Sequence, residues 1–265
     1  MITIREISVK NLITKSKLPS VDFVINPYVG CPHKCIYCYA EFMKKFTNHK
    51  EKWGDFLDAK TRYEKIDIEK FKNHNIFLSS VTDAYNPFEK KYNITKQVLE
   101  RFANSGANIS ILTKSNLVLR DIEIFKKIPN INVGFSINTT NDDIRKEIEP
   151  HASSIEKRIE ALKILHGEGI DTWTFVSPIF PQITDFEKIL ELCKRFSNSF
   201  GFENLNLKNM CRERVLNYIQ KRHKNLLPLY QEIYTCNDKS YWRKMSQEIH
   251  SYCQKNEIDY TIHFH

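Results

Sequence analysis

Short apolar runs alternate with amphipathic segments along most of this chain. The runs are rich in Val, Ile and Phe, which predicts buried strands, and they cover 21–25, 75–80, 109–113, 133–137, 172–176 and 203–207. Segments with apolar residues three and four positions apart follow several of these runs and predict helices at 94–105, 117–125, 155–166 and 184–196. Strands that alternate with helices in this way predict a parallel sheet with helical crossovers.

Local signals mark where some of these helices begin and end. Ser153 with Glu156, and Thr184 with Glu187, have the spacing of a capping box at a helix start. Gly106 follows the segment 94–105 as its C-terminal stop.

The pattern changes after residue 210, where three amphipathic segments at 212–222, 227–235 and 241–255 predict helices and a last short strand follows at 260–263. No linker and no internal repeat separates this part from the rest. We therefore expect an α/β core over 1–207 and a helical C-terminal extension over 208–265 that packs on the same domain.

The most specific chemical signal follows the first predicted strand, where Cys31, Cys35 and Cys38 have the spacing C-x₃-C-x₂-C. Three thiolates on one tight loop can bind three irons of a cubane [4Fe–4S] cluster and leave the fourth iron without a protein ligand. The spacing therefore predicts a cluster at which a small molecule binds and reacts. Because barrel enzymes place their chemistry at the C-terminal ends of their strands, this loop favours a partial (βα)6 barrel over an open sheet.

Two other uses of these cysteines are less consistent with the sequence. A structural zinc site takes four ligands, usually in two pairs, and only His33 is near, inside a loop too tight to close on the same ion. A set of disulfides does not fit seven cysteines, an odd number, with no signal peptide before them. The other four cysteines show no C-x₂-C pair and predict no second cluster; Cys193 is expected in the core, and Cys211 just after the sixth strand.

Composition narrows the class of protein. Of the 265 residues 41% are hydrophobic and 27% are charged, as in folded globular proteins. No apolar stretch is long enough to cross a bilayer and no signal peptide precedes the core, so we expect a cytoplasmic protein without a membrane partner. The net charge of +8 favours an anionic partner, although low-GC coding would also produce such a Lys-rich chain. The chain contains no P-loop and no G-x-G-x-x-G.

Tyr37, immediately before the last cysteine of the loop, and five later blocks resemble the spore photoproduct lyase-like branch of the radical S-adenosylmethionine (SAM) superfamily. The blocks keep the family order and are 81–90, 111–115, 135–138, 149–150 with Arg158, and 177–179. The resemblance implies a partial barrel of the radical SAM type with a [4Fe–4S] cluster and SAM as cofactors, which together release a 5′-deoxyadenosyl radical. It also implies an electron donor such as flavodoxin or ferredoxin.

The resemblance places SAM-binding residues at the ends of the second and third strands. Many radical SAM enzymes have a Gly-Gly-Glu run there for the SAM amino group, whereas this chain has Thr82 and Asp83, whose oxygens can accept hydrogen bonds from an ammonium. A helix cap or turn is the other reading of Asp83. Lys114 is placed to pair with the SAM carboxylate; without the resemblance it would be read as a solvated surface lysine.

Three more residues are implied near SAM. Ser136 alternates with Gly134 in the fourth strand, so both are expected to face the barrel lumen near the SAM ribose. Arg158 either reaches SAM or pairs with Glu149. Tyr37 is expected to contact the adenine, with a core aromatic as the alternative.

One position departs from the family pattern. Photoproduct lyases carry a cysteine just before the equivalent of Thr82 and Asp83, and it returns a hydrogen atom to the repaired thymine. This chain has Ser80 there. Because a serine O–H bond is too strong to donate that hydrogen readily, the resemblance does not fix the substrate.

The segment 208–224 contains an excess of Lys and Arg, including Arg212 and Arg214. It predicts either a grip on a phosphate backbone or a solvated helix face. The leading hypothesis is a radical SAM enzyme that acts on a nucleic acid or nucleotide. The alternatives are modification of a peptide or small metabolite, and a non-catalytic iron–sulfur module that binds nucleic acid. The residues assign no catalytic side chain beyond the cofactor site.

Overall fold

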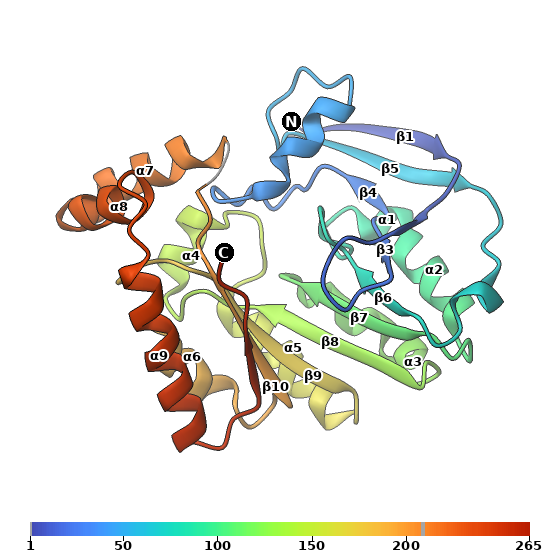
Figure 1. The fold of residues 1–265 in the computed structure, drawn as a ribbon. Helices are drawn as coiled ribbons and strands as arrows, with labels where there is room; N and C mark the ends of the chain where they lie inside the picture. Colours follow the sequence, from blue (N-terminus) through green and yellow to red (C-terminus); the bar gives the residue numbers. More distant parts are fainter. Residues whose placement is uncertain (1, 208–209) are drawn as a thin grey trace.

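The computed structural model describes residues 2–207 and 210–265, and over these residues its main sheet has eight strands (Figure 1). In spatial order they are β11 (Tyr260–Ile262), β10 (Ser199–Asn204), β9 (Asp171–Ile179), β8 (Asn130–Ser136), β7 (Asn108–Thr113), β6 (Asn75–Leu78), β3 (Phe23–Ile25) and β2 (Ile13–Lys15). Neighbours are parallel from β11 to β3, and β2 is antiparallel to β3. The predicted α/β fold with helical crossovers is confirmed.

Helices cover the outer face of this sheet, where every second strand residue is apolar and buried. In β8 these residues are Ile131, Val133 and Phe135, which share one core cluster with Leu162 and Leu165 of the fifth helix. The helices and 3₁₀ turns of this part are η1 (Tyr39–Phe46), η2 (Ile68–Phe71), α1 (Glu89–Tyr92), α2 (Ile94–Phe102), η3 (Asn116–Asp121), α3 (Ile122–Phe125), α4 (Asp142–Ile148), α5 (Ile155–Gly167) and α6 (Phe186–Cys193).

The alternate residues of each strand lie on the inner face of the sheet. In β8 these include Gly134 and Ser136. Gly134 leaves room for an aromatic ring, because a Cβ there would lie 2.2 Å from Trp173 Cε2. Trp173 and Phe175 of β9 pack together on this face with ring centroids 5.7 Å apart. Ser136 lies two residues beyond Gly134 and therefore on the same face, as predicted.

A second sheet, which the sequence pattern does not predict, stands beside the cysteine loop. It contains β1 (Thr3–Val9), β5 (Phe56–Tyr63) and β4 (Tyr28–Val29) in the order β1-β5-β4. β4 lies between the first predicted strand and the cysteines, so the chain reaches the loop through this sheet and not directly from β3. Figure 1 shows this sheet above the edge of the main sheet that β3 and β6 form.

The C-terminal part agrees with its predicted pattern. It forms α7 (Cys211–Arg222), η4 (Lys224–Leu226), α8 (Leu227–Tyr234) and α9 (Ser240–Lys255), and then β11, which pairs with β10. None of the helices in the described ranges is long and apolar enough to pass through a bilayer.

The sixth predicted strand is displaced. The prediction covered 203–207, whereas β10 ends at Asn204, because Phe200 and Phe202 supply the buried apolar positions that pair with β9. The predicted helix at 117–125 is also divided, since it begins as η3 and continues as α3.

Both predicted capping boxes are wrong by one residue. Ser154 caps α5, with its Oγ accepting from Lys157 N (3.3 Å), and Asp185 caps α6. Ser153 instead exchanges hydrogen bonds with Asn116, and the Thr184 hydroxyl donates to a backbone carbonyl of the β8–α4 segment. Both hydroxyls therefore bond to a neighbouring loop and not to the N–H groups of the helix that follows them.

Candidate active site

The loop that carries the three cysteines runs from β4 to η1 and is fixed from two sides. Ile36 N–H donates to Ile148 O (3.0 Å), which ties the loop to the end of α4. Gly30 has a φ of +89°, and a Cβ there would lie 2.4 Å from Phe56 O. Only glycine therefore fits where β5 crosses the start of the loop.

The thiols of Cys31, Cys35 and Cys38 are partly buried in this loop. Burial raises the pKa of each, to about 12 for Cys35, and charge on one thiol raises the pKa of another. Lys114 and Arg158 act in the opposite direction on Cys35, since their positive charge favours a thiolate. Across the described ranges no group of three or more His, Cys, Asp or Glu suits a single metal ion. Three thiols on one loop beside two cations suit a [4Fe–4S] cluster, because each thiolate of such a cluster binds a different iron.

Thr82 and Asp83 follow β6 and connect the cysteine loop to the sheet. Thr82 Oγ1 donates to Gly30 O (2.7 Å), at the start of the loop. Asp83 is buried, and its Oδ1 accepts from Tyr85 N (2.8 Å) and Thr113 Oγ1 (2.8 Å). The contact with Tyr85 is the turn that was the alternative reading of this aspartate.

The second carboxylate oxygen of Asp83 is also engaged by the protein. It accepts from Lys114 N (2.9 Å) and lies 3.4 Å from His33 Nδ1, inside the cysteine loop. Asp83 therefore joins β6, β7 and the loop, and its oxygens already have protein partners.

The Lys114 ammonium has no such partner. Its Nζ forms no hydrogen bond or ion pair with the described residues and lies 5.8 Å from the centre of the Tyr37 ring. Burial lowers the pKa of this lysine, but Glu149 and Cys35 outweigh burial, so the pKa is raised above 10.5. A charged, uncommitted ammonium beside the cysteines suits an anionic group of a ligand.

Arg158 pairs with Glu149, which is the second of its two predicted uses. Both side chains are fully buried and joined through Arg158 Nη2. The guanidinium also donates to Ser136 O (2.9 Å) and Ser153 O (2.9 Å). Burial raises the pKa of Glu149, but Arg158 and Lys114 lower it further, so this carboxylate stays ionised. Arg158 thus holds the end of β8 through the Ser136 carbonyl.

Tyr37 and Asn138 complete this buried network. The Tyr37 hydroxyl donates to Glu149, and its ring packs edge-on against Phe180 at 5.7 Å. Asn138 Nδ2 donates to Glu149 Oε1 (3.1 Å), while its Oδ1 is buried with no partner among the described residues. Sequence reasoning did not select Asn138, although it ends the block that contains Ser136.

A second unpredicted residue, Tyr39, lies at the mouth of the barrel. It follows Cys38 directly and is 51% exposed, and its hydroxyl donates to Ser80 O. Ser80 is the position at which the family resemblance implies a cysteine. The adjacency of Tyr39 to the cysteine motif was the available signal.

Two arginines of the basic segment 208–224 form ion pairs within the protein. Arg214 pairs with Glu41 (2.6 Å) and donates to Ile36 O (3.2 Å), so it connects α7 to the cysteine loop. Arg222 pairs with Glu147. The predicted phosphate contact of this segment stays a prediction, and these two arginines would have to exchange a carboxylate for a phosphate. Lys208 and Asn209 lie outside the described residues.

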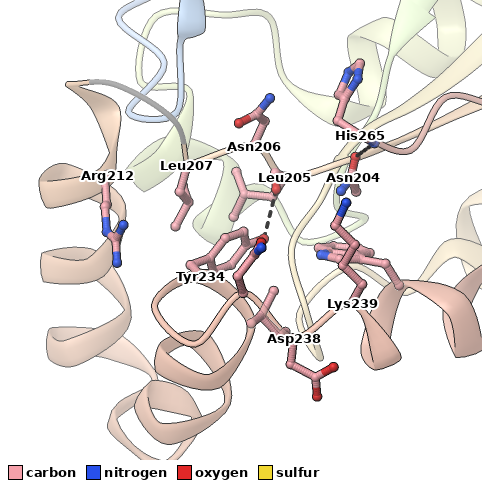
Figure 2. A pocket seen from close by; sticks show the side chains of 12 residues that line it. Asn204, Leu205, Asn206, Leu207, Arg212, Tyr234, Asp238, Lys239 and His265 are labelled. Carbon is pink, nitrogen blue, oxygen red and sulfur yellow. Dashed lines mark hydrogen bonds between the residues drawn. The ribbon is translucent and has the colours of Figure 1, made fainter.

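Arg212 faces a cavity of about 490 Å³ at the ends of β10 and β11. Figure 2 shows Arg212 from α7 and Lys239 from the loop before α9 on either side of Tyr234. His265 also lines the cavity, and its Nε2 lies 3.2 Å from Glu203 Oε1. The other carboxylate oxygen of Glu203, Oε2, accepts a hydrogen bond from Ser177 Oγ (2.6 Å). Because β10 is parallel to β6–β9, the cavity lies at the same end of the sheet as the cysteine loop.

Two of the remaining cysteines lie where they were predicted. Cys193 is buried in the core, and Cys211 begins α7 and is buried. Cys211 lies close enough to Cys38 for charge on Cys38 to raise its pKa.

Comparison with known proteins gives the family. Residues 25–195 match the model of the radical SAM superfamily. An uncharacterised protein of Methanocaldococcus jannaschii is 44% identical over 207 residues, which cover 78% of this chain and 79% of that protein. The spore photoproduct lyase of Clostridium acetobutylicum is 27% identical over 195 residues, covering 71% of this chain and 55% of the lyase.

A solved structure shows the same fold. It is a spore photoproduct lyase mutant with bound AdoMet and dinucleoside spore photoproduct, with a TM-score of 0.62 and 17% identity. The match covers 81% of this chain and 66% of that one. At this identity it supports the partial barrel, and not a substrate.

Proposed function

Because this chain belongs to the radical SAM superfamily, we propose that it is a radical SAM enzyme whose substrate is a nucleic acid or nucleotide. The family implies a [4Fe–4S] cluster and SAM. When bound, these cofactors supply a 5′-deoxyadenosyl radical that removes a hydrogen atom from the substrate.

In this proposal Cys31, Cys35 and Cys38 hold the cluster. The observation that supports the SAM site best is the uncommitted Lys114 ammonium beside them, which suits the SAM carboxylate. The Thr82 hydroxyl donates to Gly30 and keeps acceptor capacity for the SAM ammonium.

The other predicted cofactor residues either contact SAM or position the residues that do. Tyr37 offers its ring to the adenine while its hydroxyl is held by Glu149. Ser136 lies on the inner face, where the proposal puts the SAM ribose. Asp83 and Arg158 act as positioning residues, because their polar atoms already bond to the protein.

The substrate class rests on two observations. The relatives named above include enzymes whose names specify spore photoproduct, and one structure carries a dinucleoside. The cavity between α7 and α9 has a size common for small-molecule sites and presents Arg212 and Lys239, which suit phosphate groups. Its opening at the carboxyl ends of the strands is where barrel enzymes bind substrate.

The activity is tested with protein reconstituted anaerobically with iron and sulfide, then reduced in the presence of SAM. Release of 5′-deoxyadenosine supports the enzyme. Recovery of intact SAM in a protein with a full cluster would favour the non-catalytic module.

The substrate class is tested by fluorescence anisotropy with single-stranded and duplex DNA over a range of salt. Binding to a polynucleotide should weaken steeply with salt, because each neutralised phosphate releases condensed counterions. Replacing Arg212 and Lys239 together with Ala should flatten the salt slope by about two units. Lys188→Ala on α6 is the matched control. Salt-insensitive or undetectable binding of DNA and RNA would favour a peptide or metabolite.

A further inference from the structure

The segment directly after the cysteines carries an exposed patch of aromatic and basic side chains. In η1, Phe46 is 69% exposed and Phe42 is 39% exposed, and both stand out among the large apolar side chains of the described residues. The Lys45 ammonium lies between them, 4.9 Å from the Phe46 ring centre and 5.8 Å from that of Phe42. We call Phe42, Lys45 and Phe46 the η1 patch. Figure 1 shows this segment, in blue, at the outer rim of the molecule near the N-terminus.

The surroundings of the η1 patch are positively charged. Each carboxylate between residues 31 and 58 has a side-chain partner: Glu41 pairs with Arg214, Asp55 pairs with Lys34, and Glu51 and Asp58 both contact the His49 ring. Within 31–58, Lys44, Lys45, Lys50 and Lys52 form no ion pair with the described residues. The face around the η1 patch therefore attracts an acidic partner.

The opposite side of η1 packs on the cysteines. Ala40 belongs to a small core with Trp53 and Phe56, and Cys31 and Cys38 pack against this core. One thickness of a short helical turn, on the order of 10 Å, thus separates the η1 patch from the thiols. The barrel side of the loop faces Lys114 and Asp83, so this outer side is the one a second protein can reach.

We propose that the η1 patch is the docking surface for an acidic one-electron redox protein that reduces the cluster. This inference rests on the proposed function. One electron passes from the reduced donor to the cluster, so the donor is oxidised by one electron and the cluster is reduced by one. The exposed rings supply apolar contact at the centre of the interface, and the surrounding lysines steer an acidic donor to it.

The test measures cluster reduction by reduced flavodoxin in a stopped-flow instrument, in the absence of SAM and substrate. The variant is Lys45→Glu with Phe46→Ser. Leu192→Ser with Lys188→Glu makes the same change on α6, where Leu192 is 44% exposed. Dithionite, a small reductant that needs no docking surface, is used in parallel.

At low salt the η1 variant should be reduced by flavodoxin about ten-fold more slowly than the wild type, because charge reversal lowers the association rate. Added salt should slow the wild type and leave the variant little changed. Both variants should react with dithionite at the wild-type rate. Binding of oxidised flavodoxin, followed by anisotropy, should weaken in the η1 variant alone.

Equal flavodoxin rates in wild type and η1 variant would overturn the proposal. So would a matching loss with dithionite, which would mean that the patch supports the loop. Loss of DNA binding with unchanged flavodoxin rates would assign the patch to a nucleic acid. Failure of the proposed function itself is separate: dithionite would then reduce the wild-type cluster without any release of 5′-deoxyadenosine from added SAM.

Discussion

The carboxyl ends of β6 and β7 lie side by side and carry opposite charges, but the two charges are used differently. After β6, the buried Asp83 carboxylate receives hydrogen bonds from Tyr85, Thr113 and Lys114. After β7, the Lys114 ammonium has no hydrogen bond or ion pair with the described residues. Both were predicted to bind SAM, and the comparison separates a side chain whose oxygens bond to the protein from one whose charge is available to a ligand.

The reason lies in what each group costs when it is buried. A buried carboxylate without partners is strongly unfavourable, so Asp83 must be satisfied within the fold. The Lys114 side chain is half-buried. Its ammonium stays charged because Glu149 and Cys35 raise its pKa. An uncommitted charge is therefore better evidence for a ligand than a charge at a strand end.

The largest expected effect comes from Cys35, the thiol on which Lys114 and Arg158 act most directly. Cys35→Ala should abolish the broad absorption near 400 nm, roughly the charge-transfer region of sulfur-ligated iron, because three thiolates are the minimum for this cluster. Iron and sulfide analysis checks it. Cys236→Ala, at an exposed cysteine, is the control and should keep full cluster content.

If Cys35→Ala retained its iron and sulfide, the cysteine loop would not be the cluster site. The comparison between the two strand ends would then lose its meaning, because neither would face a cofactor.

The next effect concerns the committed carboxylate. Asp83→Ala removes the acceptor of several buried donors at once and should lower the free energy of unfolding by about 3 kcal/mol. Urea unfolding of the metal-free protein measures it. Thr82→Val, which removes one hydrogen bond to Gly30, should cost about 1 kcal/mol. An Asp83 variant of wild-type stability with weakened SAM affinity would reverse the assignment and make Asp83 a ligand residue.

The sheet and its crossovers could be predicted from sequence because their signal is local. Ile109 and Ile111 alternate with more exposed residues in β7, and the helix periods are equally regular. The β1-β5-β4 sheet could not, because β5 contains Asp58, Lys60 and Arg62 and has little apolar alternation at its end. Asp58 is satisfied by His49, a partner that no local pattern reveals.

The site residues divide along the same line. Spacing and family resemblance were enough to select the cysteines, Thr82, Asp83 and Lys114. They could not tell that Arg158 is satisfied by Glu149 and two carbonyls, or that Arg214 is engaged by Glu41, because these partners depend on the fold. Sequence reasoning missed Asn138 and Tyr39 for the same reason, because the place of each in the site follows from a hydrogen bond to a residue far away in the sequence.

The third effect tests the uncommitted charge. Lys114→Met keeps the apolar stem and removes the ammonium, so SAM affinity should fall by about 1.5–3 kcal/mol, roughly ten- to a hundred-fold, with the cluster intact. Isothermal titration with SAM measures it. Because the pKa of Lys114 is raised above 10.5, the charge persists as pH rises through the neutral range, and wild-type affinity should show no loss from this group up to about pH 10.

Lys126→Met, at an exposed lysine paired with Glu168, is the control and should bind SAM normally. Unchanged SAM affinity in Lys114→Met would remove this lysine from the site and leave the two strand ends without the difference described above.

The smallest effect concerns a second hydrogen-bond donor, on the η1 side of the cysteines. The Trp53 indole N–H is buried beside Cys38, and its interaction with this thiol opposes the rise that burial causes in the pKa of Cys38. A hydrogen bond to a ligating sulfur favours the more negative, reduced cluster. Trp53→Phe should therefore lower the reduction potential by about 20–60 mV, which corresponds to about 0.5–1.5 kcal/mol.

An anaerobic redox titration followed by electron paramagnetic resonance measures this shift in the reconstituted protein without SAM. Trp242→Phe, on α9 at the far cavity, is the matched control and should leave the potential unchanged. A shift of equal size in both variants would indicate a general effect of losing an indole. A shift in Trp53→Phe alone would mean that the Trp53 indole N–H stabilises the reduced cluster through Cys38.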